Sequence, residues 1–252
     1  MPDSPYEFKP FPYSSHDRIL HLVGREKRPL RILDVGAAGG YLGKIWKASG
    51  HYVAGIEYDA AAAERAREYY DAFQVADVET YEFPFHQEFD YIIFADVLEH
   101  LRDPAAVLLR CLPALKESGK LVISVPNIAN WVIRLSLLSG KFDYRERGIL
   151  DRTHLRFFTL STLKELLNEV FCDVLEAVPT PLPVQLVLPF TRNRFFAPLH
   201  EAHYALTRSW KTLFAYQFVI VAAPRPVRVS QNSADGPARE RELPAENALA
   251  IR

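Results

Sequence analysis

The stretch ILDVGAAGGYLG, residues 32–43, determines how the rest of this chain is interpreted. An apolar run ends at Asp34, a turn rich in glycine follows at once, and the residues after the turn have the pattern of a helix. Glycines let the backbone of such a turn come close to a ligand, and the first turn of a helix offers unpaired N–H groups. The stretch therefore predicts a site for a nucleotide-like molecule.

An acidic residue at the expected distance supports this interpretation. In α/β folds that bind nucleosides, such a residue closes the next strand about 20 positions after the glycine turn. Glu57 ends the apolar run HYVAGIE (51–57) and meets this expectation. A glycine turn with a distant acid also fits a dinucleotide-dependent dehydrogenase, so these two features alone leave the class of protein open.

The composition is that of a globular protein. The chain has 252 residues, of which 49% are hydrophobic, and a formal net charge of -1. These values suit one compact α/β domain with additions, and a charge so near zero gives no electrostatic argument for nucleic acid as a partner. The first 15 residues show no signal peptide, and no apolar run approaches the roughly 20 residues that span a bilayer. We expect a cytoplasmic protein.

Strands and helices alternate through the first half of the chain. Strands are expected at 30–35, 51–57, 73–77, 89–96 and 120–125, and helices at 17–24, 40–48, 60–70 and 104–116. Continuous apolar strands separated by helices are typical of a parallel sheet covered on both faces. Residues 117–119 are expected to form the turn before the fifth strand.

The second half of the chain has a different pattern. A helix is expected over 127–138, another after the capping residue Thr159, and strands over 172–178 and 216–223. The intervening residues, about 181–215, form an insertion longer than a hairpin needs. Residues 1–15 are expected to be irregular and residues 224–252 to be a disordered tail, which leaves one domain over 16–223.

The motifs at the strand ends resemble those of the class I S-adenosylmethionine-dependent methyltransferases. The first motif there is Asp-x-Gly-x-Gly-x-Gly, and residues 34–40 read DVGAAGG. The stretch FDYIIFADVLEHLRDP (89–104) is similar to the F-D-x-I-x-x-x-x-V-L-E-H-L signature of the ubiquinone-methyltransferase-like subgroup, and SGKLVISVPNIANW (118–131) resembles its fifth strand. The resemblance runs from about residue 16 to residue 178.

This resemblance implies an α/β fold with a Rossmann-like, seven-stranded methyltransferase sheet. The sheet would be mostly parallel, with the last strand antiparallel and helices on both faces. The residues at 181–215 would be a helical insertion before the last strand. The implied cofactor is S-adenosylmethionine, with S-adenosylhomocysteine as product.

The resemblance also assigns cofactor-binding residues. Gly36 and Gly40 would lie along the methionine part and the ribose. Glu57 would hold both ribose hydroxyls, because a carboxylate can accept two hydrogen bonds side by side. Asp77 would accept from the adenine amino group. The other expected cofactor contacts are Asp34, Ala37, Tyr41, Tyr58, Val78 and Ala95.

Two residues of the first motif leave alternatives open. Asp34 could hold the glycine turn by hydrogen bonds instead of touching the cofactor. Ala38 stands where the family commonly has glycine, and its Cβ could restrict how closely the backbone approaches the cofactor.

The segment GILDRTHLRFFT (148–159) is the expected source of acceptor chemistry. It resembles a D-R-T-H-x-R-F-F-T stretch of bacterial methyltransferases that accompany sugar and cell-surface polysaccharide enzymes. His154 is a candidate general base for methyl transfer to a hydroxyl. The alternative is a histidine that orders its loop by bonding Asp151 or backbone. Asp151, Arg156 and Asn127 are the expected acceptor contacts, and no metal is expected.

The resulting hypothesis is methyl transfer from S-adenosylmethionine to oxygen of a small molecule or glycan. One alternative acceptor is a quinone or another lipophilic small molecule. Another alternative is a non-catalytic protein that keeps the fold to bind a partner. The insertion could be a helical cap or a dimer contact, or it could meet a membrane or a lipid-linked acceptor. The sequence leaves the acceptor and the oligomeric state open.

Overall fold

The computed structural model describes residues 11–226. Of the expected irregular segment 1–15, residues 11–14 form turns, and Ser15 already begins the first helix. The expected tail lies almost entirely outside the described residues, and its first residue, Pro224, belongs to the last strand.

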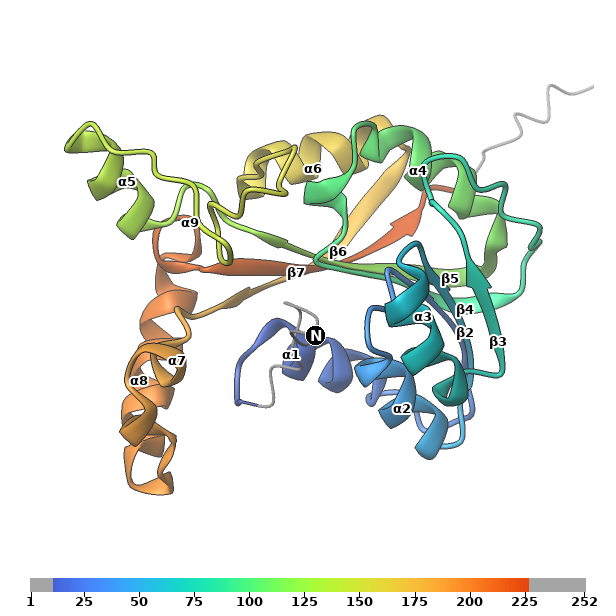
Figure 1. Cartoon of the computed structure of the whole chain (residues 1–252), viewed down its shortest axis with the longest axis horizontal. Coiled ribbons are helices and arrows are strands. Elements are labelled where there is room, and N and C mark those ends of the chain that lie inside the picture. Colours follow the sequence, from blue (N-terminus) through green and yellow to red (C-terminus); the bar gives the residue numbers. More distant parts are fainter. Residues whose placement is uncertain (1–10, 227–252) are drawn as a thin grey trace, which may run out of the picture.

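Seven strands form one sheet in the order β3-β2-β1-β4-β5-β7-β6 (Figure 1). The first five strands pair in parallel, and β7 runs antiparallel to both β5 and β6. The expected seven-stranded sheet, mostly parallel with an antiparallel last strand, is therefore confirmed. The strand bounds are Arg31–Val35 (β1), Tyr52–Glu57 (β2), Ala72–Val75 (β3), Phe89–Ala95 (β4), Leu115–Pro126 (β5), Cys172–Thr180 (β6) and Gln217–Pro224 (β7).

Helices cover both faces of the sheet, as expected (Figure 1). One face carries α1 (Ser15–Val23), α2 (Tyr41–Ala48) and α3 (Ala60–Ala66). The other face carries α4 (Pro104–Cys111) and α6 (Leu160–Glu169). Two apolar clusters result, and burial of such side chains from water is the main force that holds helices on a sheet.

Short side chains fix where several helices begin. Asp59, Asp103 and Thr159 each accept a hydrogen bond from a backbone N–H in the first turn of α3, α4 and α6. Such a cap satisfies a donor that has no partner within the helix. The expected cap at Thr159 is confirmed, and the proline of α4 stands in its first turn, where it loses no helical hydrogen bond.

Several expected boundaries were wrong. β5 already begins at Leu115, because Leu115 pairs with Phe89 across a register shift, so residues 117–119 lie within the strand. α5 (Trp131–Leu138) begins four residues after the expected Asn127, since Asn130 caps it. α3 and α4 end early, and a 3-10 turn follows each of them, at Arg67–Tyr69 and Leu112–Ala114.

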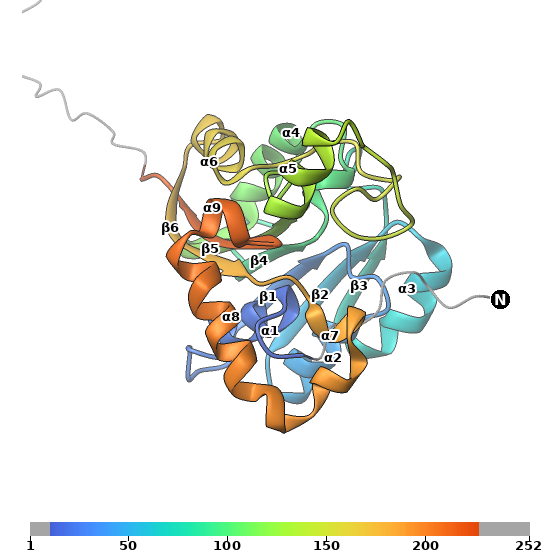
Figure 2. The ribbon, with the colours of Figure 1, turned by 90° about the vertical axis from the view of Figure 1, so that its left-hand side faces the viewer.

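The insertion between β6 and β7 is helical, as expected. It holds α7 (Val184–Val187), 3-10 turns at Pro189–Arg192 and Arg194–Phe196, α8 (Ala197–Ser209) and α9 (Lys211–Phe214). α8 contacts β6 and lies on the same side of the sheet as α1 (Figures 1 and 2). Within residues 11–226, no helix is long and apolar enough to cross a membrane.

Candidate functional site

The register of the sheet brings the expected cofactor residues to one edge. Val35 pairs with Ile56 and with Phe94, while Glu57 pairs with Val75. The carboxyl ends of β1, β2, β3 and β4 therefore lie side by side. Open α/β sheets bind their ligands at this edge.

The glycine turn is fastened to the end of β2. The N–H groups of Gly36 and Ala37 both donate to the carbonyl oxygen of Ile56, at 2.8 and 3.0 Å. Gly36 has φ +76°, and a Cβ there would lie 2.5 Å from Cγ2 of Val97. The first glycine of the motif is thus required both by its left-handed backbone and by the close approach of Val97.

Gly40 ends the turn and caps α2 with φ +75°. A Cβ at Gly40 would lie about 3 Å from atoms of Ala66 and Tyr69, which belong to α3 and the turn after it. The role that the structure shows for this glycine is close packing of the turn against α3. A contact with the cofactor remains a prediction.

Ala38 has φ +45°, a conformation that side chains rarely adopt. Its N–H donates to Oε2 of Glu57 at 2.8 Å. The residue that departs from the family pattern therefore keeps a glycine-like backbone, and its turn closes on the acidic residue of β2.

Glu57 is the centre of this edge. Its side chain is buried, with 7% of its surface exposed, and its other oxygen, Oε1, accepts from the N–H of Asp59 at 2.9 Å. Each carboxylate oxygen has two lone pairs, so each keeps one that can accept from a ligand. Two acceptors side by side match a pair of neighbouring hydroxyls, and this donor set fits the ribose of the expected cofactor.

Asp34 is buried below the glycine turn, and its contact with a cofactor stays a prediction. Its exposed fraction is 2%, and its Oδ2 accepts from the hydroxyl of Tyr70 at 2.7 Å. Burial raises the pKa of Asp34 to about 7, and the hydrogen bond from Tyr70 opposes that rise. The structure thus shows Asp34 joining β1 to the chain before β3.

The remaining expected cofactor residues differ in exposure. Asp77 is exposed at the end of the β3 segment, and its Oδ1 accepts from the N–H of Glu79 at 2.9 Å, so it keeps lone pairs for a ligand. Val78 is buried, whereas Tyr58 is 76% exposed. Tyr41 is partly exposed in the first turn of α2.

His154 lines an open cavity of about 520 Å³ together with Phe142, Asp143, Tyr144 and Arg152. Its Nδ1 lies 3.1 Å from the carbonyl oxygen of Ile149. A carbonyl only accepts, so this contact places the proton on Nδ1 and leaves the lone pair on Nε2. Burial and the neighbouring His100 lower the pKa of His154, which keeps the ring neutral near pH 7.

Aromatic rings surround this histidine. The ring of His154 makes edge contacts with His100 and Phe157, at centroid distances of 4.9 and 6.2 Å. Phe157 in turn makes an edge contact with Phe142. The wall of the cavity is therefore suited to a flat ring.

A group of possible metal ligands shares this position. One ligand atom each of Glu99, His100 and His154 lies within 4.8 Å of the others, and Glu99 is almost completely buried. Carboxylate and imidazole are common ligands of divalent cations, so the group has the composition of a metal site. The sequence indicated no such site, because His154 lies far from the other two in the chain.

The expected acceptor contacts are used within the fold. Asp151 accepts from the N–H and hydroxyl of Thr153, which favours an ordering role in its own turn. Arg156 donates to the carbonyl of Arg102. Arg152, which belongs to the same predicted segment (148–159), lines the cavity instead.

Asn127, expected to contact the acceptor, is tied inside the fold. It is fully buried, and its amide donates to the carbonyl of Ala215 at 2.9 Å while its oxygen accepts from Ala129. The expectation of an acceptor contact is replaced by a structural role, because Asn127 fastens the end of the insertion to β5.

Asp96 is a site residue that the sequence did not single out for function. It follows β4 with φ +58°, and its Oδ1 accepts from the hydroxyl of Ser124 and from Nε2 of Gln217. A non-glycine residue in this conformation at a sheet edge often marks a functional position. Gln217 is 121 residues away in the chain, so no local pattern could have indicated this contact.

Comparisons with known proteins agree with this geometry. A family model described as a methyltransferase domain matches residues 11–177. A ubiquinone biosynthesis O-methyltransferase of Rhodopseudomonas palustris is 29% identical over 153 residues, which cover 58% of this chain and 60% of the relative. A tRNA 5-carboxymethoxyuridine methyltransferase of Escherichia coli is 30% identical and covers 53% of each chain. The matched part thus spans little more than half the length of these relatives.

Solved structures show the same fold. A magnesium protoporphyrin IX methyltransferase of Synechocystis with bound S-adenosylhomocysteine has a TM-score of 0.57 at 13% identity, covering 84% of this chain and 82% of that one. An S-adenosylmethionine-dependent methyltransferase of Archaeoglobus fulgidus has a TM-score of 0.57 at 19% identity, covering 82% and 91%. Identities this low establish the fold alone.

Proposed function

We propose, since the chain belongs to the methyltransferase-domain family, that it transfers the methyl group of S-adenosylmethionine to a hydroxyl oxygen of a small molecule or glycan. The observation that carries the choice of oxygen is the position of His154, which lines the cavity while its Nδ1 lies 3.1 Å from the carbonyl oxygen of Ile149. A hydroxyl must lose its proton during methylation, and this ring can accept it.

Four groups at the sheet edge would hold the cofactor. The free lone pairs of Glu57 would accept from the ribose hydroxyls, and Asp77 would accept from the adenine amino group. The backbone of Gly36 and Ala95 would lie along the rest of the molecule. When bound, S-adenosylmethionine supplies an electrophilic methyl group, so the protein needs mainly to align the two reactants.

His154 would act at its Nε2. The hydrogen bond from Nδ1 to Ile149 fixes the orientation of the ring, and the lowered pKa keeps Nε2 unprotonated near neutral pH. Nε2 can then accept the hydroxyl proton as the oxygen–methyl bond forms. Arg152, in the same cavity, would attract an acceptor with an acidic group.

A second acceptor class, a phenol or quinol, is favoured by a specific observation. Phe142 and Tyr144 line the cavity, and Phe157 packs against both rings. Flat aromatic molecules stack well on such rings. Nearby, α5 exposes Leu135 and Leu138, at 56% and 83%, which is compatible with a lipophilic or lipid-linked acceptor.

The first experiment measures cofactor binding. S-adenosylhomocysteine is titrated by calorimetry into the wild-type protein, the Glu57→Ala variant and the Glu64→Ala variant. Glu64 is an exposed acid on α3 and serves as a matched control. We expect micromolar binding by the wild type and the control, and a loss of at least about 100-fold in Glu57→Ala, because two hydrogen bonds to a charged group are removed.

The second experiment identifies the acceptor. Transfer of labelled methyl is measured for hydroxylated sugars, uronates and catechols, with the wild type and His154→Gln. Methyl transfer to one of these classes by the wild type, and its loss in His154→Gln, would support the proposal. The class that is methylated would show which of the two acceptor classes is correct. Absence of cofactor binding in the first experiment would instead favour a non-catalytic member of the family.

A further inference from the structure

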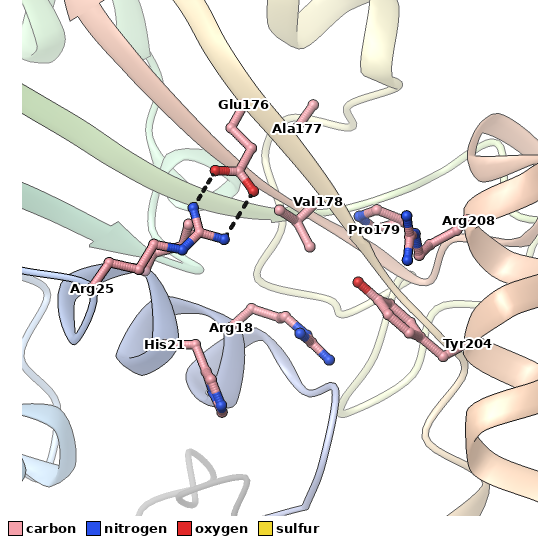
Figure 3. A pocket seen from close by; sticks show the side chains of 10 residues that line it. Arg18, His21, Arg25, Glu176, Ala177, Val178, Pro179, Tyr204 and Arg208 are labelled. Atoms are coloured by element: carbon pink, nitrogen blue, oxygen red, sulfur yellow. Dashed lines mark hydrogen bonds and ion pairs between the residues drawn. The ribbon is translucent and has the colours of Figure 1, made fainter. Parts of the chain in front are cut away.

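A second cavity lies on the α1 face of the sheet, outside the candidate active site. Its volume is about 340 Å³. Its lining comes from α1, from Arg25 two residues after α1, from β6 and from α8 (Figure 3). The lining includes Arg18, His21, Arg25, Glu176, Tyr204 and Arg208, and these six residues define what we call the basic pocket.

Cationic side chains outnumber acidic ones in the lining of the basic pocket. Three arginines and a histidine line it, against the single acid Glu176. Glu176 is occupied by Arg25, whose two Nη atoms contact its oxygens at 2.6 and 3.2 Å. Beside the pocket, Asp17 lies 3.8 Å from Nε of Arg18 and 3.3 Å from Nδ1 of His21, too far to accept a strong hydrogen bond from Arg18.

Arg18 is held in place before any ligand arrives. Its guanidinium carbon lies 4.6 Å from the ring centroids of both Tyr13 and Tyr204, and these two rings stack on each other at 4.4 Å. Its Nε is buried, and within residues 11–226 it finds no hydrogen-bond acceptor. The nearest acid, Asp17, stays 3.8 Å from this nitrogen, so the charge of Arg18 is only partly compensated, and its place in the lining favours an anionic ligand.

Arg208 approaches the same space from the insertion. It lies in the last turn of α8, with its guanidinium carbon 5.9 Å from the Tyr204 centroid. In the described part of the chain it has no acidic partner at ion-pair distance. Figure 3 shows Arg18 and Arg208 on two sides of Tyr204, with the Arg25–Glu176 pair at the upper left of the view.

We propose that the basic pocket binds the phosphate group of a small phosphorylated molecule. Arginine forks match phosphate oxygens two at a time, and the two arginines without acidic hydrogen-bond partners, Arg18 and Arg208, face one space. The volume exceeds that of a phosphate alone, so the rest of the molecule would lie against Val178, Pro179 and Tyr204. This site is independent of the proposed methyl transfer.

The test is calorimetric titration of inorganic pyrophosphate into the full-length protein at low salt. We expect binding, weakened about tenfold or more by Arg18→Gln and by Arg208→Gln, since each removes charged hydrogen bonds to the anion. Arg65→Gln, which removes an exposed arginine from α3, is the matched control and should bind as the wild type does. Because Arg208 is exposed, its variant is expected to fold even if Arg18→Gln does not.

Two further measurements keep the outcomes distinct. Thermal unfolding and S-adenosylhomocysteine binding should be the same in Arg208→Gln as in the wild type. Because the two sites share no residue, failure of the methyltransferase proposal would leave the pyrophosphate test valid. Sedimentation with phosphatidylglycerol and phosphatidylcholine vesicles tests a lipid headgroup as the source of the phosphate. Pyrophosphate binding that is absent, or equally strong in Arg208→Gln, would overturn the proposal, as would arginine-dependent binding to vesicles alone.

Discussion

Two regions of the carboxyl edge are built in different ways. In the glycine-turn region, residues 34–40 with Glu57, the decisive hydrogen bond joins Ala38 to a residue 19 positions later. In the acceptor region, residues 96–157 with the end of the insertion, Asp96 is bonded to Gln217 and Asn127 to Ala215, 121 and 88 positions away. The first region is a local motif, whereas the second forms only when β7 has paired with β5 in the sheet.

This difference has a consequence for substitutions. The glycine turn is packed so closely that a change there acts on folding and on cofactor binding together. His154 is half-buried beside an open cavity, so a change there can act on chemistry while the fold persists. The following predictions test this contrast, from the largest expected effect to the smallest.

His154→Gln should lower kcat by about 100-fold or more, because proton removal by a positioned base contributes a factor of this size. Binding of S-adenosylhomocysteine and thermal stability should remain close to those of the wild type. In the wild type, the acidic limb of the kcat profile should have its midpoint below about pH 6.5, since burial and His100 lower the pKa of His154. Turnover within a few-fold of the wild type would exclude His154 as the base.

Gly36→Ala should destabilise the fold by about 2–4 kcal/mol. The new Cβ would lie 2.5 Å from Val97 and would require a left-handed backbone for alanine. In the double variant Gly36→Ala with Val97→Ala, the loss of stability caused by the clash should disappear. The loss caused by the left-handed backbone of residue 36 should persist. Denaturant unfolding of the two single variants and the double variant measures this, and strict additivity would contradict it.

Asp34→Asn should change the pH dependence of stability. Burial raises the pKa of Asp34 to about 7 from 3.8, so the folded protein holds a proton that the unfolded chain releases between these values. Stability from this group is therefore complete at low pH and falls as pH rises toward 7. The side chain of the variant does not ionise. Between pH 4 and pH 8, its free energy of unfolding should therefore rise relative to that of the wild type by at most about 4 kcal/mol.

Unfolding free energies of the wild type and Asp34→Asn at several pH values provide the measurement, and Glu64→Gln serves as an exposed control. A difference between wild type and Asp34→Asn that stays constant from pH 4 to pH 8 would show that Asp34 ionises normally in the fold.

Ala38→Gly should stabilise the protein slightly, by about 0.5 kcal/mol, because glycine adopts φ +45° without strain but loses more backbone entropy on folding. Ala61→Gly, at an exposed position in the first turn of α3, is the matched control and should destabilise by about 0.5–1 kcal/mol. Loss of stability in both variants, measured by thermal unfolding, would mean that Ala38 is not strained.

Much of the fold could be predicted because its signals are local. Apolar runs, a glycine turn and capping residues such as Asp59 and Thr159 lie next to the elements they define. The boundaries that were wrong depended on partners elsewhere. Leu115 joins β5 because Phe89 is its neighbour in the sheet, and α5 begins late because Asn127 and Asn130 bond the Phe214–Ala215 backbone.

The candidate site divides in the same way. Glu57 and the glycines were recognisable from their spacing, and the structure brings them to one edge. The roles of Asp34 and Asn127 were not, because burial and hydrogen-bond partners decide whether a polar side chain can reach a ligand. The basic pocket was invisible for the same reason, since its arginines come from both ends of the chain.

The sequence by itself determined the alternation of elements, the glycine turn and its acidic partner, because these follow from backbone conformation and from periodic burial over short stretches. Only the tertiary structure decided which polar groups face a cavity and which are tied inside the fold. A hydrogen bond or a cation–π contact depends on distances of a few ångströms. Asp96 with Gln217, and Arg18 with Tyr204, reach such distances only when segments far apart in the chain pack together.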